Sequence, residues 1–195
     1  MRRCLIIAGL LAAGTAFAAY RDIERTDYGQ WTFTAAIDDS DNTYSCAVST
    51  HWNNSGREVR LVALQQPYSL NLAVRDPSWS AGQGRIGTMR LNVDGRSWTA
   101  NTDGINATLI NARLATDGAS VARFIAAFKA GNTLSITTPW GERVVAGLRG
   151  SSAATTAMQA CMDRYFGGRP PAMRAQPGYG GGASGKPPPA GGSKF

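Results

Sequence analysis

Two apolar stripes of helical spacing flank a short alternating pattern in residues 120–165, and no other stretch constrains the fold as strongly. The first stripe has the i, i+3, i+4, i+7 spacing of one helix face and consists of Val121, Phe124, Ile125 and Phe128. Ser120 is a candidate N-cap, and Gly131 follows the stripe where a helix commonly ends. The sequence therefore predicts a helix between these two residues.

Beyond this helix the spacing changes. Apolar and polar residues alternate in 132–138 and in 143–148, with a Pro-Trp-Gly turn between them, which predicts a hairpin. A second helical stripe follows a cap at Ser151 or Ser152 and consists of Ala154, Ala157, Met158, Cys161 and Tyr165. Cys161 is thus expected on the core-facing side of the final helix.

Residues 1–18 have the three parts of a secretory signal peptide. Arg2 and Arg3 precede an apolar run over 5–13, and an Ala-Phe-Ala cleavage motif ends at Ala18. The alternative, a membrane anchor, needs about 20 apolar residues, and this run is shorter. We therefore expect a periplasmic or secreted protein with no integral membrane span.

The chain after the signal peptide contains two cysteines, Cys46 and Cys161. In an oxidising compartment such a pair most often forms one disulfide, although two unpaired buried thiols are the alternative. Closing a loop of this length, more than about 100 residues, stabilises a fold by about 4 to 5 kcal/mol in the chain-entropy account.

No metal site or cofactor is predicted. Two cysteines and the single histidine, His51, cannot complete a structural zinc site without carboxylates. The acidic run 38–41 fits a polar hairpin turn better than a calcium loop, because Tyr44 and Thr50 occupy positions where such a loop needs Gly and Glu.

Short alternating segments dominate the region before the first helix. We expect strands at 31–37, 44–48, 59–63, 70–74, 89–93, 97–100 and 107–114, after a charged lead-in over 20–29 and with a loop over 76–87. Because the helices come late and together, the fold class is α+β: a mostly antiparallel β-sheet or sandwich of six to eight short strands with two late helices. The whole of 19–166 is one domain by length.

Residues 167–195 contain nine Gly and six Pro, a composition that predicts a disordered C-terminal tail. The tail also carries four basic residues and no acidic one, so it accounts for much of the net charge of +7. The body retains 14 basic and 13 acidic side chains, a net charge of +1. Such a balanced body does not indicate a nucleic-acid partner.

His51 is the only imidazole, so general-base chemistry of the Ser-His-Asp kind would have to use it. Ser49, Ser55 and the acidic run 38–41 are near in sequence, but no G-x-S-x-G nucleophile motif is present. We therefore predict no catalytic residues, and keep an envelope hydrolase with His51 as base as an alternative.

The candidate partner-binding residues are three tryptophans: Trp79, Trp140 and Trp52. Trp79 and Trp140 lie in predicted loops beside Pro or Gly, where an aromatic side chain often anchors recognition. The alternative is that these side chains only hold their loops against the body. Trp52 adjoins His51 at the end of a predicted strand.

Two regions resemble small exported bacterial β-rich proteins. The first region is the C-terminal unit, with the segments 124–134 and 148–154 and Cys161. The second is the opening hairpin, with the Trp-Thr-Phe-Thr run at 31–34 and Cys46. The first is similar to the invasion-associated locus B family and to type VI secretion-associated accessory proteins, and the second to the former family. The resemblance implies a non-enzymatic periplasmic role and carries over no catalytic residue.

Together these features predict a non-enzymatic periplasmic or secreted binding or accessory protein of the bacterial cell envelope. Its expected partner is another envelope protein or a cell-wall component. A third hypothesis, besides the hydrolase, is a structural protein tethered to the wall by the 167–195 tail.

Overall fold

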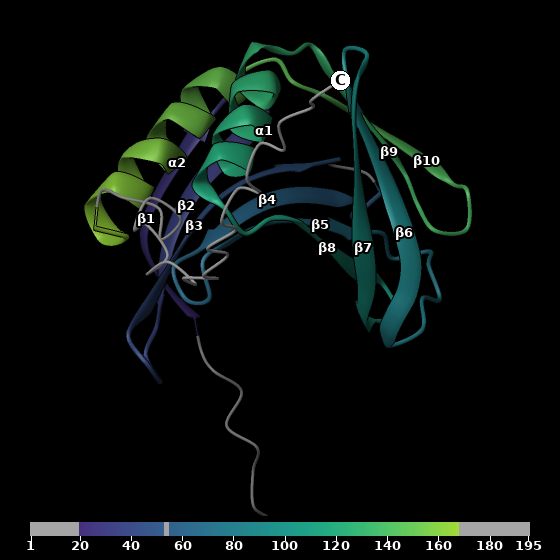
Figure 1. The fold of residues 1–195 in the computed structure, drawn as a ribbon, viewed down its shortest axis with the longest axis horizontal. Helices are drawn as coiled ribbons and strands as arrows, with labels where there is room; N and C mark the ends of the chain where they lie inside the picture. The colour runs from purple at the N-terminus through teal and green to yellow at the C-terminus, as the bar shows by residue number, and fades with distance from the viewer. Residues whose placement is uncertain (1–19, 53–54, 168–195) are drawn as a thin grey trace, which may run out of the picture.

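The computed structural model describes residues 20–52 and 55–167, which form ten strands in one antiparallel sheet and two helices (Figure 1). The first five strands are β1 (Tyr20–Tyr28), β2 (Trp31–Asp38), β3 (Thr43–His51), β4 (Glu58–Leu64) and β5 (Ser69–Arg75). They are followed by β6 (Gly84–Val93), β7 (Arg96–Asn106), β8 (Leu109–Ala115), α1 (Gly118–Ala130), β9 (Thr133–Thr137), β10 (Arg143–Gly147) and α2 (Ser151–Tyr165). The predicted signal peptide, and the predicted tail beyond Gly167, lie outside the described residues.

The α+β class, the antiparallel sheet and the two late helices are confirmed, but the strand count was too low. Ten strands lie in one continuous sheet, in the order β1-β2-β3-β4-β5-β8-β7-β6-β9-β10, rather than six to eight. The predicted lead-in at 20–29 is instead strand β1, paired with β2 along its whole length. Its residues are exposed on both faces, so it has no apolar alternation that a sequence pattern could detect.

Strands β6 and β7 are also longer than predicted. β6 begins at Gly84, inside the expected loop, and β7 continues to Asn106. The outer parts of these strands pair with each other across a register shift between Arg85 and Gly87. Because these outer parts cover little of the core, backbone pairing rather than side-chain burial defines them.

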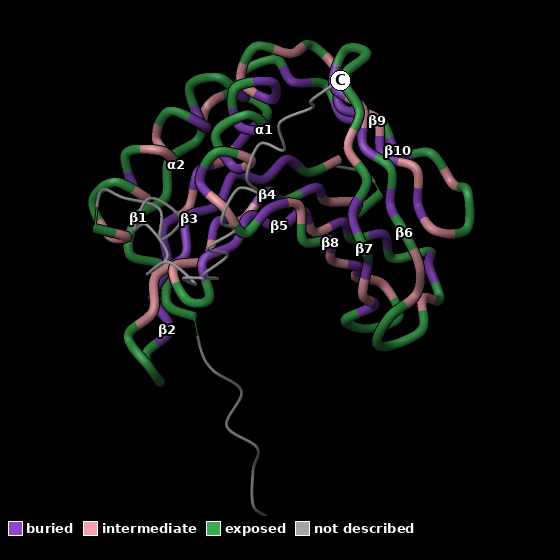
Figure 2. Tube along the Cα trace, in the orientation of Figure 1, coloured by how far each residue is buried: buried purple, intermediate pink, exposed green. Residues whose placement is uncertain are grey.

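One face of the sheet is apolar, and it curves around α1. The Phe128 ring of α1 meets Trp31 of β2 edge-on at 5.1 Å, while Phe124 meets Trp98 of β7 at 5.0 Å. The predicted stripe of α1 is buried as expected, at Val121, Phe124, Ile125 and Phe128. Figures 1 and 2 show the helices within the bend, next to the buried parts of the strands.

A disulfide joins α2 to the sheet. Cys46 of β3 and Cys161 of α2 are both buried and bonded to each other across 115 residues of sequence, as predicted. Near the end of the helix, Tyr165 stacks on Tyr44 at a ring separation of 4.5 Å. The Gln65 side-chain amide donates to the Tyr165 carbonyl at 2.8 Å. α2 is therefore fixed over β1, β2 and β3.

Both helices begin differently from the sequence prediction. α1 starts at Gly118, and its cap is Asp117, whose carboxylate accepts from the Ser120 N–H at 2.8 Å. The N-cap of α2 is Gly150 with φ +90°, while Ser151 is buried and donates its hydroxyl to the Phe128 carbonyl at 3.3 Å. A side chain at Gly150 would come within 2.6 Å of the Tyr28 carbonyl oxygen, so this close approach requires glycine.

The segment after β10 also brings the two ends of the sheet together. The Trp31 indole N–H of β2 donates to the Gly147 carbonyl of β10 at 3.1 Å. Gly150 then passes against Tyr28 of β1 as the chain enters α2. The sheet therefore bends far enough for the end of its last strand to contact the start of its second.

Candidate functional site

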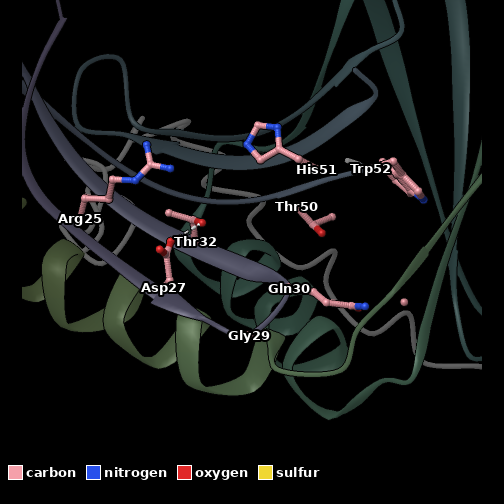
Figure 3. A pocket seen from close by; sticks show the side chains of 9 residues that line it. Arg25, Asp27, Gly29, Gln30, Thr32, Thr50, His51 and Trp52 are labelled. Atoms are coloured by element: carbon pink, nitrogen blue, oxygen red, sulfur yellow. Dashed lines mark hydrogen bonds between the residues drawn. The ribbon is translucent and has the colours of Figure 1, made fainter. Parts of the chain in front are cut away.

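An open pocket of about 520 Å³ lies where these two ends of the sheet meet (Figure 3). Its lining comes from β1, the β1–β2 turn, β2, the end of β3 and the end of β10. The lining residues are Arg25, Asp27, Gly29, Gln30, Thr32, Thr50, His51, Trp52 and Gly147. Most of them carry a hydrogen-bonding side chain, and Trp52 contributes the one large apolar ring.

Strand register places Asp27, Thr32 and His51 on one side of the sheet. Asp27 of β1 pairs with Thr32 of β2, whose hydroxyl donates to the Asp27 carboxylate at 2.7 Å. Thr32 in turn pairs with Ser49 of β3, and His51 lies two residues further along that strand. Because side chains alternate between faces, these residues lie opposite the buried Trp31 face. Figure 3 shows Arg25 and His51 extending on this same side.

The far wall of the pocket is backbone. Gly29 has φ +69° in the β1–β2 turn, which places Gln30 beside Gly147 of β10. The Trp31–Gly147 hydrogen bond holds that wall in place. The pocket therefore depends on contacts between segments that are more than a hundred residues apart, such as Trp31 and Gly147.

His51 lines this pocket, but it has no catalytic neighbours there. Its side chain is 48% exposed at the end of β3, and its nearest charged atom is Oε1 of Glu58 at 3.9 Å, beyond hydrogen-bonding distance. Glu58 is itself paired with Arg60 at 2.8 Å. Within 20–52 and 55–167, no Ser or Asp side chain hydrogen-bonds the imidazole. The described geometry thus provides no nucleophile for His51 to activate.

Two of the predicted recognition tryptophans lie together, away from the pocket. Trp79 and Trp140 meet edge-on at 5.0 Å, and both indole N–H groups donate to Oε2 of Glu142, at 2.7 and 3.3 Å. Trp79 is only 8% exposed, whereas Trp140 is 46% exposed. Only Trp140 therefore offers substantial surface to a partner, and Trp79 holds its loop against the body.

Glu142 is also the centre of an ion-pair cluster, which we call the Glu142 cluster: Arg57, Asp76, Trp79, Trp140 and Glu142. Arg57 donates to Glu142 Oε1 at 3.2 Å and pairs with Asp76 through its Nε. Burial would raise the pKa of Asp76, but donors from Ser78 and Arg57 outweigh it and hold that pKa below its ordinary value of 3.8. The cluster ties the β9–β10 turn to the loops that begin β4 and follow β5.

Two pocket residues are candidates from sequence: Trp52 as a partner-binding residue and His51 as the base of the alternative hydrolase. The sequence does not indicate Arg25, Asp27 or Gln30 as site residues. Arg25 and Asp27 were assigned to the lead-in, because β1 has no apolar face. One sequence signal could have indicated them: Arg25 and Asp27 are two residues apart and stand just before Gly29 of a tight turn. Thr32 stands at the corresponding position after that turn. Such a pattern places three polar side chains on one side of a hairpin.

The fold and the site define an antiparallel α+β domain with an open polar pocket at the junction of its sheet ends. No family model, curated protein or solved structure matches this chain. Within the described ranges no three His, Cys, Asp or Glu side chains gather as metal ligands. No helix in the same part of the chain has the length and apolar character needed to cross a membrane.

Proposed function

We propose that this protein is an exported, non-enzymatic binding protein of the bacterial cell envelope, and that its pocket holds a hydroxyl-rich cell-wall component such as a glycan fragment. The observation that supports this most is the composition of the pocket. Polar side chains of several kinds surround one tryptophan in a space of about 520 Å³, which falls within the usual range for small-molecule sites.

The mixture of side chains favours a sugar over an apolar ligand. Arg25 only donates hydrogen bonds, Asp27 only accepts them, and Gln30 and Thr32 do both, so hydroxyl groups can be satisfied in either direction. Trp52 adds a large apolar surface with a polar edge, suited to the carbon-bound face of a ring. A hydrophobic ligand would leave these groups desolvated and unpaired.

Export is supported by the signal-peptide pattern and by the disulfide. A buried Cys46–Cys161 bond fits an oxidising compartment outside the cytoplasm. The resemblance to exported β-rich bacterial proteins favours the same location and a non-catalytic role. The hydrolase hypothesis has less support, because His51 has no hydrogen-bonded nucleophile among the described residues.

Calorimetric titration with soluble peptidoglycan glycan fragments tests the proposal. Trp52→Ala and Arg25→Ala should each weaken binding by about tenfold, the usual effect of losing one well-placed contact. Arg85→Ala is the matched control, because Arg85 is an exposed arginine paired with Asp103 and is not part of the pocket lining. Equal affinity in all four proteins, or no binding by the wild type, would reject the pocket as a glycan site.

The same titration separates binding from hydrolysis. If the fragments are cleaved over time and His51→Ala stops cleavage, the protein is the alternative hydrolase. If the fragments are recovered intact, the binding function stands.

A further inference from the structure

The free edge of β10 is the second surface of interest, and it differs from the pocket in chemistry. β10 pairs with β9 on one side only, and β10 is the last strand of the sheet in the described residues. An unpaired strand edge presents a row of backbone N–H and C=O groups, which match the backbone of another extended chain.

The hydrogen bonds around β10 show which groups point outward. The Glu142 carbonyl accepts from the Thr138 N–H at 2.9 Å, and the Leu148 N–H donates to the Asn132 carbonyl at 2.8 Å. The backbone N–H and C=O groups of the even-numbered residues therefore point toward β9. The backbone groups of the odd-numbered residues point away from β9. These residues are Arg143, Val145 and Gly147, and the Gly147 carbonyl accordingly accepts from Trp31.

The side chains at this edge indicate what kind of chain would bind. Val145 is 45% exposed, and the exposed Trp140 lies in the turn just before the strand. Arg143 and Arg149 flank Val145 along the chain and are both exposed. The nearest acid, Glu142, is already bonded to two indoles and to Arg57. The edge is thus apolar at its centre and cationic on both sides.

We propose that β10 is a docking strand for an extended, acidic polypeptide segment of a partner protein, which adds to the sheet as an eleventh strand. The outward N–H and C=O groups of Arg143 and Val145 supply the backbone hydrogen bonds. Val145 provides the apolar contact, and the two arginines select acidic side chains. This goes beyond the glycan pocket and does not depend on it.

The test is selection from a displayed library of random linear peptides on the disulfide-bonded wild-type protein. Enriched peptides should alternate β-branched with acidic residues. The key variant is Val145→Pro, which removes an outward N–H and no bond to β9, and it should weaken binding of the enriched peptides about tenfold or more. Val145→Thr is the matched control, because it keeps the N–H and the β-branched shape, and its affinity should stay within about threefold of wild type.

Hydrogen exchange provides a readout independent of folding defects. Peptide binding should slow exchange of the Arg143 and Val145 amides and leave Val144 and Ala146 unchanged, since these already bond to β9. If Val145→Pro fails to fold, Arg143→Glu replaces it and should weaken binding of the acidic peptides by a similar factor.

Three results would overturn the proposal. One is that no peptide is enriched. Another is that the enriched peptides bind equally to wild type and to both edge variants, without slowing the Arg143 and Val145 amides. The last is that wild type sediments as a dimer and Val145→Pro as a monomer, which would assign the edge to a second copy of this chain.

Discussion

The two ends of the sheet are held by different physical means. At the β1–β3 end, α2 lies over the strands and is joined to them by the Cys46–Cys161 bond and by aromatic stacking of Tyr44 on Tyr165. At the β9–β10 end, the turn is held by the Glu142 cluster and the Trp31–Gly147 hydrogen bond. Both ends bury apolar side chains, including Leu134, Ile136, Val144 and Ala146 of β9 and β10. The first end has a covalent link to a helix in addition, whereas the contacts named for the second are polar ones.

The two edge strands differ in the same way. β1 is protected against unwanted pairing by alternating charges, by a register shift after Asp22 and by the Arg164–Glu24 contact from α2. β10 carries an exposed apolar side chain, Val145, at its centre, between the exposed Arg143 and Arg149. The comparison shows that a helix and a disulfide secure one end of the sheet, whereas β10 forms its other edge in the described residues.

The largest expected effect is at the covalent end. Replacing both Cys46 and Cys161 by Ala should lower the free energy of unfolding by about 4 kcal/mol, because the closed loop of 115 residues no longer restricts the unfolded chain. Urea denaturation of wild type and double variant measures this difference. Free alkylation of both wild-type thiols without denaturant or reductant would show that the bond does not form.

The next effect is at the polar end. Glu142→Ala should cost about 2 kcal/mol, because the buried Trp79 N–H loses its acceptor and Arg57 loses one of its two carboxylate partners. Glu142→Gln should cost less, since the amide oxygen can still accept from Trp79. Hydrogen exchange should rise in β10 more than in β2, and an equal rise in both would contradict a stabilising effect of the Glu142 cluster that is local to the β9–β10 end.

Asp94 adds a pH dependence to the β9 end. Its carboxylate accepts from the backbone N–H groups of Asn132 and Thr133 and from the side-chain amide of Asn132. These hydrogen bonds lower the pKa of Asp94 below its ordinary value of 3.8. Because the pKa is lower in the folded than in the unfolded state, the ionised carboxylate stabilises the fold at pH values above 3.8. This stabilisation is lost as the pH falls below 3.8 and through the folded-state pKa. Asp94→Asn should therefore destabilise the protein at about pH 6, and by less at about pH 2, because the contribution of the charged carboxylate is lost as the pH falls through its folded-state pKa.

Denaturation of both proteins at these two pH values checks the sign. The loss at neutral pH should be smaller than that of Glu142→Ala, because Asp94 is exposed to solvent. A pH-independent difference would mean that the side chain acts through packing rather than through its charge.

The smallest effect is expected for the surface contact between α2 and β1. Arg164 and Glu24 are 3.5 Å apart with side chains 62% and 44% exposed, so solvent screens their attraction. Arg164→Ala should change the free energy of unfolding by less than about 0.5 kcal/mol. A loss comparable to that of Glu142→Ala would show that the covalent end depends on this ion pair after all.

Parts of the candidate site could be predicted from sequence and others could not. Trp52 and His51 were identifiable because an isolated aromatic and the sole imidazole at a strand end are conspicuous. Arg25 and Asp27 were not, because a strand exposed on both faces has the composition of a loop. The sequence left open whether Trp79 binds a partner or holds its loop against the body, since its acceptor, Glu142, is 63 residues away in sequence.

The sequence by itself determined the α+β class, the stripes of α1 and α2, the β9–β10 hairpin and the core-facing position of Cys46 and Cys161. These features follow from local periodicity, which records which side of an element is buried. Only the tertiary structure decided that all ten strands form one sheet, that its ends meet at a pocket, and that the outer edge of β10 has no neighbouring strand in the described residues. Strand order and sheet curvature depend on contacts between distant residues, such as Trp31 with Gly147, which leave no periodic trace in either segment.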